Sequence, residues 1–243
     1  MLTLAVESTA VTASVCIAEE EAPLALFTVS NKNTHSENLL PMIESSLLRL
    51  SLSMNGIGLF ALSAGPGSFT GVRIGAATVK GLAFGKDKPC VAVSTLEALA
   101  YNLIGFEDRI LCPVMNARRG QVYNALFEAH DGILTRLAPD RALSVTELEA
   151  ELRTVYAGRE VMLSGDGYDL TKQTFLDLTS PIVCPGTPVA LRAQSAYSVA
   201  MIGQKMYKEG NTVSDSDLKP FYLRLSQAER ERLKRENPGG IKM

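Results

Sequence analysis

The part of the sequence best suited to ligand chemistry is a glycine-rich run at residues 64–75, AGPGSFTGVRIG. It follows an apolar run, GLFALS, and precedes a segment of small residues, AATVKGLAF, so we predict a strand, a turn and a helix. Glycine-rich turns between a strand and a helix often hold phosphate groups at the N-terminus of the helix. The run is therefore the first candidate for a phosphate site.

The spacing of its glycines matches neither of two common phosphate-binding patterns. The P-loop requires Lys-Ser or Lys-Thr after the glycines, and neither pair follows here. The dinucleotide fingerprint requires GxGxxG, whereas Gly65, Gly67 and Gly71 give GxGxxxG. Phe69 is also bulky at the point where the backbone would approach a pyrophosphate. We therefore expect these glycines to serve close packing rather than phosphate binding.

The expected helix after this run carries one face of small residues, which are Gly71, Gly75, Ala76, Ala77 and Gly81. Glycine inside a helix costs about 1 kcal/mol relative to alanine, so several of them indicate that something approaches the helix closely. Small residues allow two helices to pack backbone to backbone. Two interpretations remain open, namely tight packing within the chain and a helix interface with another subunit.

The sequence offers no arrangement typical of a metal or a nucleophile. His35 and His130 are the only histidines, and they form no HxxxH or HExxH pattern, although metal ligands must converge on one ion. No GxSxG nucleophile elbow is present. The four cysteines form no CxxC pair, so we interpret them as small buried residues in a reducing compartment. We expect no catalytic residue, no metal and no cofactor.

The overall composition predicts a cytoplasmic protein. The chain has 243 residues, 46% of them apolar, and a net charge of −2, so no overall basic excess indicates nucleic-acid binding. No apolar run approaches the roughly 18 residues of a membrane helix, and no signal peptide precedes the first expected strand. The segment from Gln227 onward is densely charged. It is either a solvated terminal helix or a basic arm that contacts RNA.

The order of apolar runs and capping patterns predicts two similar halves. The first half reads as three strands followed by helix, strand, helix, strand and helix, with its main helices at Ser36–Leu50 and Thr70–Phe84. A second series begins at residue 109 with a strand, a polar turn and a returning strand. It ends with a long helix predicted over Pro188–Lys208. The repeated pattern of elements indicates a duplicated fold.

Several of these segments carry a resemblance to a known family. The run AGPGSFTGVRIGAATVKGLAF resembles the signature segment of the TsaB family, also called YeaZ. LAVESTAVTASVCI resembles the opening hairpin of that family, and THSENLLPMIE resembles its first helix. VAVSTLEALA, VMNARRGQVYNALF and KPFYLR match the family in kind and order. The sequence is thereby identified as a member of this glycoprotease-like family of bacterial tRNA threonylcarbamoyladenosine synthesis.

The resemblance implies a fold. We expect an α/β protein of the actin, sugar-kinase and Hsp70-like superfamily, with two tandem ribonuclease-H-like lobes whose mixed sheets are flanked by helices. We place the first lobe at residues 1–106 and expect the segment 213–243 to complete it. We place the second lobe at residues 107–212.

The resemblance also implies a function as a non-catalytic scaffold. The family partners with the transferase TsaD, which attaches a threonylcarbamoyl group to the adenosine beside the anticodon of tRNA. A third subunit, the ATPase TsaE, joins the pair, tRNA is reached through the complex, and the isolated protein would form a homodimer. From the two main helices of the first half we expect a partner interface made of Leu39, Ile43, Leu47, Leu50, Gly71, Ile74, Gly75 and Thr78.

An alternative is a nucleotide-dependent transferase or hydrolase that acts alone in the cleft between the lobes. Superfamily members that handle nucleotides usually place an aspartate in the first hairpin of each half, where this chain has Glu7 and Asn116. Asn116 cannot act as a base, which argues against hydrolysis. The weak candidates for nucleotide binding are Glu7, Ser8, Thr9 and Arg118, together with the turn at Gly165–Gly167.

Overall fold

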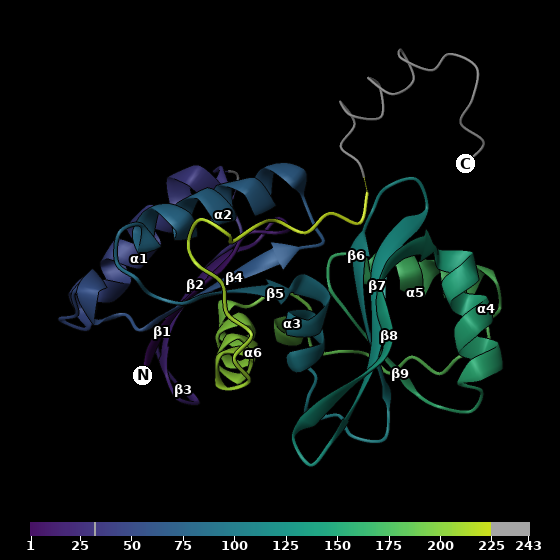
Figure 1. Ribbon diagram of the computed structural model, residues 1–243. Coiled ribbons are helices and arrows are strands. Elements are labelled where there is room, and N and C mark those ends of the chain that lie inside the picture. Colours follow the sequence, from purple (N-terminus) through teal and green to yellow (C-terminus); the bar gives the residue numbers. More distant parts are fainter. Residues whose placement is uncertain (32, 225–243) are drawn as a thin grey trace.

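The computed structural model describes residues 1–31 and 33–224 of the chain. These residues form two lobes, each built on one mixed β-sheet with helices packed against it (Figure 1). This arrangement confirms the predicted α/β class with two sheets flanked by helices. The charged segment from Gln227 onward, for which the sequence left a solvated helix and an RNA-contacting arm open, lies outside the described residues.

The sheet of the first lobe has five strands in the order β3-β2-β1-β4-β5. Strands β1, β2 and β3 form the expected antiparallel meander, whereas β4 and β5 extend the sheet in parallel with β1. The strands are β1 (Leu2–Glu7), β2 (Ala13–Glu19), β3 (Ala22–Val29), β4 (Leu59–Gly65) and β5 (Cys90–Ser94). Because side chains alternate along a strand, Leu4 and Val6 face one side of this sheet and Ala5 the other.

Helices cover both faces of the first sheet (Figure 1). Helices α1 (His35–Arg49) and α2 (Phe69–Ala83) pack on the face of Leu4 and Val6, and both begin within one residue of the prediction. Helix α1 starts with the expected capping box between Thr34 and Glu37. Among the described residues, no helix combines the length and the apolar character that crossing a bilayer requires.

Helix α6 (Ala196–Lys208) covers the opposite face of the first sheet, which corrects two predictions. The helix expected over Pro188–Lys208 is interrupted, because a short 3-10 turn at Val189–Leu191 precedes a new helix start that the Ser195 side chain caps. The buried side chains of α6 pack against Ala5, Ala61 and neighbouring residues of the first sheet. Helix α6 therefore belongs to the first lobe, and the second lobe ends before residue 196 rather than at 212.

The sheet of the second lobe has four strands in the order β8-β7-β6-β9. They are β6 (Ile110–Asn116), β7 (Gln121–His130), β8 (Ile133–Ser144) and β9 (Val161–Ser164). Helices α4 (Val145–Val155) and α5 (Tyr168–Asp177) cover one face, and the sequence analysis missed α5. Helix α3 (Thr95–Tyr101) packs against the other face, where Leu99 shares a core with Leu111 and Phe127.

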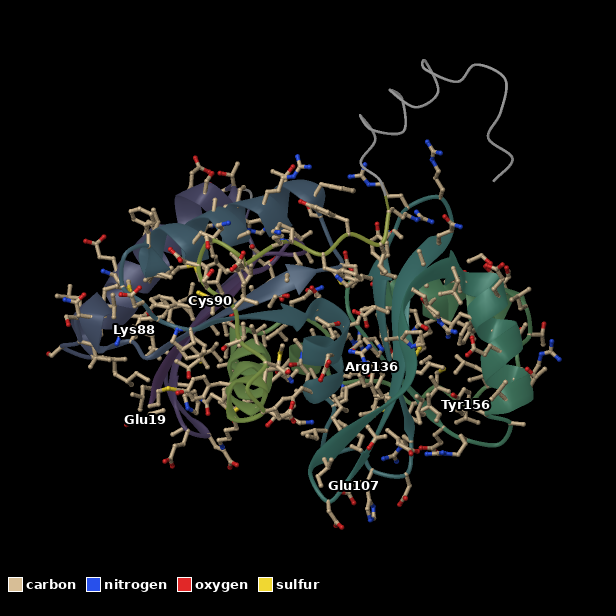
Figure 2. The ribbon with its side chains drawn as sticks, in the orientation of Figure 1. Glu19, Lys88, Cys90, Glu107, Arg136 and Tyr156 are labelled. Atoms are coloured by element: carbon tan, nitrogen blue, oxygen red, sulfur yellow. The ribbon has the colours of Figure 1, made fainter. Side chains whose placement is uncertain are left out.

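Polar contacts also join the lobes along α3. Arg136 of β8 lies at the junction between the lobes (Figure 2), forms an ion pair with Glu97 of α3 at 2.7 Å and lies over the ring of Phe127. The Ser94 hydroxyl donates a hydrogen bond to Asp140 at 2.5 Å. Because these groups come from both lobes, the contacts join β8 of the second sheet to β5 and α3.

The close packing of α6 on the sheet gives a first testable prediction. A Cβ atom added at Gly203 would lie 2.8 Å from Cβ of Ala61 and 3.0 Å from a methyl group of Val91. We expect Gly203→Ala to lower the free energy of unfolding by about 1–3 kcal/mol, because α6 must move away from the sheet. Urea denaturation followed by circular dichroism measures the change.

The matched control is Gly81→Ala on α2, where an added Cβ meets nothing within 4 Å. That variant should gain up to about 1 kcal/mol from the better helix propensity of alanine. Equal stabilisation by both substitutions would show that α6 does not lie against the sheet as closely as the structure describes.

Candidate functional site

The candidate site lies where parallel strands end at the mouth between the lobes. Strand β1 ends at Glu7 and its parallel neighbour β4 at Gly65, beside the N-terminus of α2. In the second lobe, β6 ends at Asn116 next to its parallel neighbour β9. In open α/β sheets, ligands bind outside the carboxyl ends of the strands. The sequence candidates therefore lie at the edge where a ligand would be expected.

In the first lobe, the chain itself fills this edge. The glycines face the turn after β1: a Cβ atom at Gly71 or Gly75 would overlap Ser8, and one at Gly67 would overlap Thr9. The structure thus confirms that these glycines serve close packing. At Gly71 and Gly75 the atoms that approach α2 belong to the same chain, whereas Gly81 on the same face meets nothing within 4 Å, so an interface with another subunit stays a prediction there.

Backbone and hydroxyl groups of that turn satisfy the start of α2. The Ser68 N–H donates to the Thr9 carbonyl at 2.7 Å, and the Gly71 N–H donates to the Ser68 hydroxyl at 3.3 Å. The Ser8 hydroxyl donates to the Gly71 carbonyl at 2.9 Å. A phosphate at a helix N-terminus needs free N–H donors and open space. Here residues 8 and 9 occupy the space, and the Ser68 and Gly71 N–H groups already have partners within the chain.

Glu7 is buried beneath the same turn. One oxygen of its carboxyl accepts hydrogen bonds from the Thr9 N–H and hydroxyl, both at 2.6 Å, and the other has no partner among the described residues. Burial is the main cause that raises the pKa of Glu7 above its ordinary value. Glu7, Ser8 and Thr9 are all inaccessible to solvent. These three weak candidates for nucleotide binding therefore build the turn, and their part in nucleotide binding stays a prediction.

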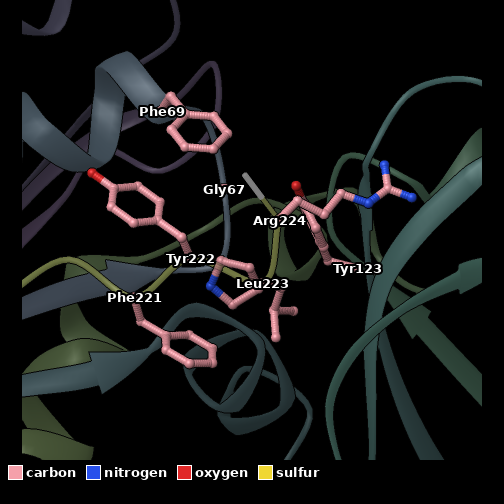
Figure 3. A pocket seen from close by; sticks show the side chains of 8 residues that line it. Gly67, Phe69, Tyr123, Phe221, Tyr222, Leu223 and Arg224 are labelled. Atoms are coloured by element: carbon pink, nitrogen blue, oxygen red, sulfur yellow. The ribbon is translucent and has the colours of Figure 1, made fainter. Parts of the chain in front are cut away.

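The last described segment, Phe221–Arg224, closes the mouth; we call it the strap. The Phe221 N–H donates to the Ala64 carbonyl at 2.7 Å in the first lobe, and Arg224 donates to the Ala117 carbonyl at 3.0 Å in the second. Figure 3 shows Phe69 and Tyr222 facing each other, with Arg224 reaching toward the second lobe.

The crevice under the strap is too narrow to admit a water molecule. Its lining residues come from both lobes and from the strap, and they are Pro66, Gly67, Phe69, Tyr123, Phe221, Tyr222, Leu223 and Arg224. The sequence analysis used KPFYLR only as a point of resemblance and missed its position across the mouth. The paired aromatic residues before a basic residue were the available signal.

The predicted partner interface divides into two groups of residues. Leu39 and Ile43 are 0% and 2% exposed in the core of the first lobe, and Gly71 and Gly75 pack on Ser8. In this chain the sheet and the turn after β1 already cover these four, so their place in a partner interface stays a prediction. The remaining four are partly exposed, and they are Leu47, Leu50, Ile74 and Thr78.

An exposed leucine adds to the second group. Leu40 is 53% exposed on α1, although an apolar side chain of this size is usually buried. It lies seven residues before Leu47, so both side chains share one flank of the helix. The heptad spacing of these two leucines was the signal that sequence reasoning overlooked.

The histidines lie apart in the structure as in the sequence. His35 Nε2 is 2.7 Å from the Ala10 carbonyl, and His130 lies on the surface next to Asp131. Within residues 1–31 and 33–224, no three His, Cys, Asp or Glu side chains gather closely enough to hold a metal ion.

Comparison with known proteins decides the family. A family described as TsaD, tRNA N6-adenosine threonylcarbamoyltransferase, matches residues 28–232. The chain is 32% identical over 229 residues to the tRNA threonylcarbamoyladenosine biosynthesis protein TsaB of Bacillus subtilis (strain 168), across 94% of this chain and 96% of that protein. The chain belongs to the TsaB family.

Two further comparisons agree with this membership. The TsaB protein of Escherichia coli (strain K12) is 32% identical over 194 residues, which cover 78% of this chain and 80% of that protein. A solved structure described as an uncharacterized protein with similarity to peptidase YEAZ from Pseudomonas aeruginosa matches with a TM-score of 0.75 at 23% identity. The match covers 92% of this chain and 99% of that structure, so the two share the TsaB-family fold.

The buried carboxyl of Glu7 gives the second prediction. The pKa of Glu7 is raised in the folded state, so the folded protein keeps this proton to a higher pH than the unfolded chain does. In the unfolded chain, glutamates titrate at about 4.3. This group therefore lowers stability as pH rises from about 4.3 through the raised pKa. We expect Glu7→Gln to have a higher free energy of unfolding than the parent at pH 7, and to lose less stability as the pH rises from 4. Chemical denaturation across this range measures both.

Glu37→Gln is the control with the opposite sign. Glu37 is exposed, and hydrogen bonds from the Thr34 N–H and hydroxyl lower its pKa. The charged carboxylate of Glu37 therefore stabilises the fold above the pKa that glutamate has in the unfolded chain, and this stabilisation is lost as the pH falls. Glu37→Gln should accordingly lower the free energy of unfolding at neutral pH. If Glu7→Gln lost stability at pH 7 as well, the buried carboxyl would be charged and well solvated, contrary to the structure.

Proposed function

We propose that this chain is a non-catalytic docking subunit that associates with a TsaD-type threonylcarbamoyltransferase during formation of threonylcarbamoyladenosine in tRNA. Its relatives are named tRNA threonylcarbamoyladenosine biosynthesis proteins. The match to the transferase family over residues 28–232 supports pairing, because related folds carry equivalent helix faces that can pack against each other. A TsaE-type ATPase joins this pair, and tRNA is bound through the complex.

The observation that carries the proposal is that the chain occupies its own ligand edge. Ser8 and Thr9 pack against the start of α2 and hydrogen-bond to Gly71 and Ser68, and the strap closes the crevice in front of it. Catalysis needs a nucleophile, base or acid that can touch a substrate. Glu7, the acidic residue at the end of β1, is inaccessible to solvent. Binding on outer surfaces remains the function that the geometry supports best.

The docking surface we propose is the outer flank of α1 and α2, which lie side by side on the first sheet (Figure 1). Leu40 and Leu47 share one flank of α1, and Ile74 and Thr78 lie four residues apart on α2. Full burial of one leucine side chain stabilises a complex by about 1.5–3 kcal/mol. A partner that covers this flank would gain that energy. In the absence of the transferase, a second copy of this chain would cover the same surface.

Co-purification with the TsaD-type transferase of the same organism tests the proposal. We expect Leu40→Asp and Thr78→Arg each to weaken capture at least tenfold, about 1.4 kcal/mol, because each places a charge in an interface that excludes water. Both positions are at the surface, so the melting temperature should change little. Titration of labelled transferase measures the affinity.

Leu176→Asp is the matched control, because Leu176 is 65% exposed on α5 in the other lobe. It should leave capture unchanged. Undiminished capture by both α1–α2 variants would place the interface elsewhere.

A second readout concerns the modification itself. Mass spectrometry of tRNA treated with the transferase and the ATPase should show threonylcarbamoyladenosine only when this chain is present. The solitary-enzyme alternative predicts ATP turnover by the isolated chain, and turnover that Glu7→Gln abolishes would favour that alternative over docking.

A further inference from the structure

Two arginines occupy an unusual backbone conformation at the tip of the β6–β7 hairpin. Arg118, Arg119 and Gly120 have φ angles of 65°, 57° and 70°. The Gln121 N–H donates to the Arg118 carbonyl at 3.2 Å and closes a turn whose two central residues both have positive φ. Such type I′ turns favour Asn-Gly. Here an arginine takes the place of the asparagine.

This conformation costs free energy for arginine. Left-handed backbone costs roughly 1–2 kcal/mol for a residue with a Cβ atom, and less for asparagine and glycine. Among the described residues, no other two consecutive non-glycine residues have positive φ. Strain of this kind persists where the surrounding structure holds it in place, and it clusters at binding and catalytic sites. The pair is therefore a candidate for a binding role.

Both arginine side chains are exposed at the mouth between the lobes. None of the ion pairs found among the described residues includes Arg118 or Arg119. The acid beside this turn is Asp166, whose carboxylate accepts a hydrogen bond from the Asn116 N–H at 3.1 Å. The turn thus presents two positive charges to solvent.

The strap holds this turn in place. Arg224 donates to the Ala117 carbonyl at 3.0 Å and to the Gln121 side chain, and its guanidinium lies over the ring of Tyr123 at 5.8 Å. The Asn116 side chain accepts from the Arg118 N–H at 2.8 Å. The two arginines therefore project from a fixed base, which lowers the entropy lost on binding.

Aromatic rings lie on the same strap, two and three residues before Arg224. Tyr222 stacks on Phe69 with ring centres 4.8 Å apart, and Arg73 lies 5.7 Å from the centre of the Tyr222 ring. Tyr222 is 38% exposed and Phe221 is also exposed. Figure 3 shows these rings on the strap beside Arg224. The mouth therefore combines exposed rings with the positive charges of Arg118 and Arg119.

We infer that Arg118, Arg119 and the Phe69–Tyr222 stack form a binding surface for single-stranded RNA. The arginines contact phosphates, and an unpaired base packs against the exposed aromatic side chains. Arginine beside exposed aromatic rings is the combination that single strands bind, whereas an acidic protein would need no aromatic surface. The choice of tRNA as the source of this strand rests on the proposed function, whereas the surface itself does not.

The test uses the full-length protein and a fluorescent anticodon stem-loop from a tRNA that reads codons beginning with A. The variant is Arg118→Asn/Arg119→Asn, because asparagine tolerates left-handed backbone and should keep or raise the melting temperature. Loss of two phosphate contacts should weaken binding about tenfold near 0.15 M salt. It should also reduce the slope of log affinity against log salt by about 1.4. Fluorescence anisotropy over a salt series measures both.

Lys205→Gln/Lys208→Gln is the matched control. It removes the same charge from α6, where both lysines are exposed, and should leave affinity nearly unchanged. Equal weakening by the two double variants would show that only net charge matters, and would overturn the proposal. So would unchanged binding by Arg118→Asn/Arg119→Asn.

Tyr222 tests the aromatic part separately. Tyr222→Leu should weaken binding without changing the salt slope, and Tyr222→Phe should bind as the parent does, because stacking requires the ring and not the hydroxyl. A fully paired RNA bound as tightly as the stem-loop would overturn the assignment to single strands.

Capture of the TsaD-type transferase is measured in parallel to separate the two proposals. Loss of transferase capture by Arg118→Asn/Arg119→Asn with RNA binding intact would assign the arginines to a protein contact and overturn the inference. If the parent fails to capture the transferase but the stem-loop results hold, the proposed docking function fails and the RNA surface stands.

Discussion

The close approach of the turn after β1 to the first turns of α2 is the constraint on which the rest of the structure depends. Ser8 lies where Cβ atoms at Gly71 and Gly75 would be, so α2 can settle on the sheet only if both positions lack a side chain. This contact fixes α2 against β1 and β4, and α1 packs beside it on the same face. It also explains why the helix tolerates glycines that lower its own stability.

The same contact determines which surfaces are available for function. In many α/β folds the edge at the carboxyl ends of the strands receives a ligand. Here the Thr9 carbonyl accepts the Ser68 N–H at that edge, and the carboxyl of Glu7 is buried beneath the turn. The chain thus fills this edge of the first lobe with its own residues. The surfaces that we propose for partners are the flank of α1 and α2 and the mouth crossed by the strap.

The two lobes are tied together at two separate places. The ion pair between Arg136 and Glu97 joins the second sheet to α3, and Arg224 joins the strap to the tip of the β6–β7 hairpin. The strap also bonds to Ala64 at the end of β4. Its position therefore couples the glycine-rich run of one lobe to the arginine turn of the other, although the two lie about fifty residues apart in the sequence.

Local patterns in the sequence were sufficient to predict those helices and strands whose formation depends mainly on residues within the element itself. The capping box at Thr34 and Glu37, the periodicity of α1 and the apolar run of β4 each predict an element within two residues of its observed bounds. The glycine run matches no phosphate-binding motif, and from this mismatch the sequence correctly predicted close packing at Gly67, Gly71 and Gly75. These signals are local, because capping and periodicity act between residues close in the sequence.

Only the tertiary structure decided which face each residue turns toward. Helical spacing could not show that Leu39 meets the sheet while Leu40 meets solvent, since both are leucines on adjacent positions. Nor could it assign α6 to the first sheet, across more than a hundred residues of chain. The burial of Glu7 and the strap across the mouth likewise arise from contacts between distant segments. The sequence by itself determined the family and most of the elements, α5 excepted, and long-range packing determined which of their residues remain exposed.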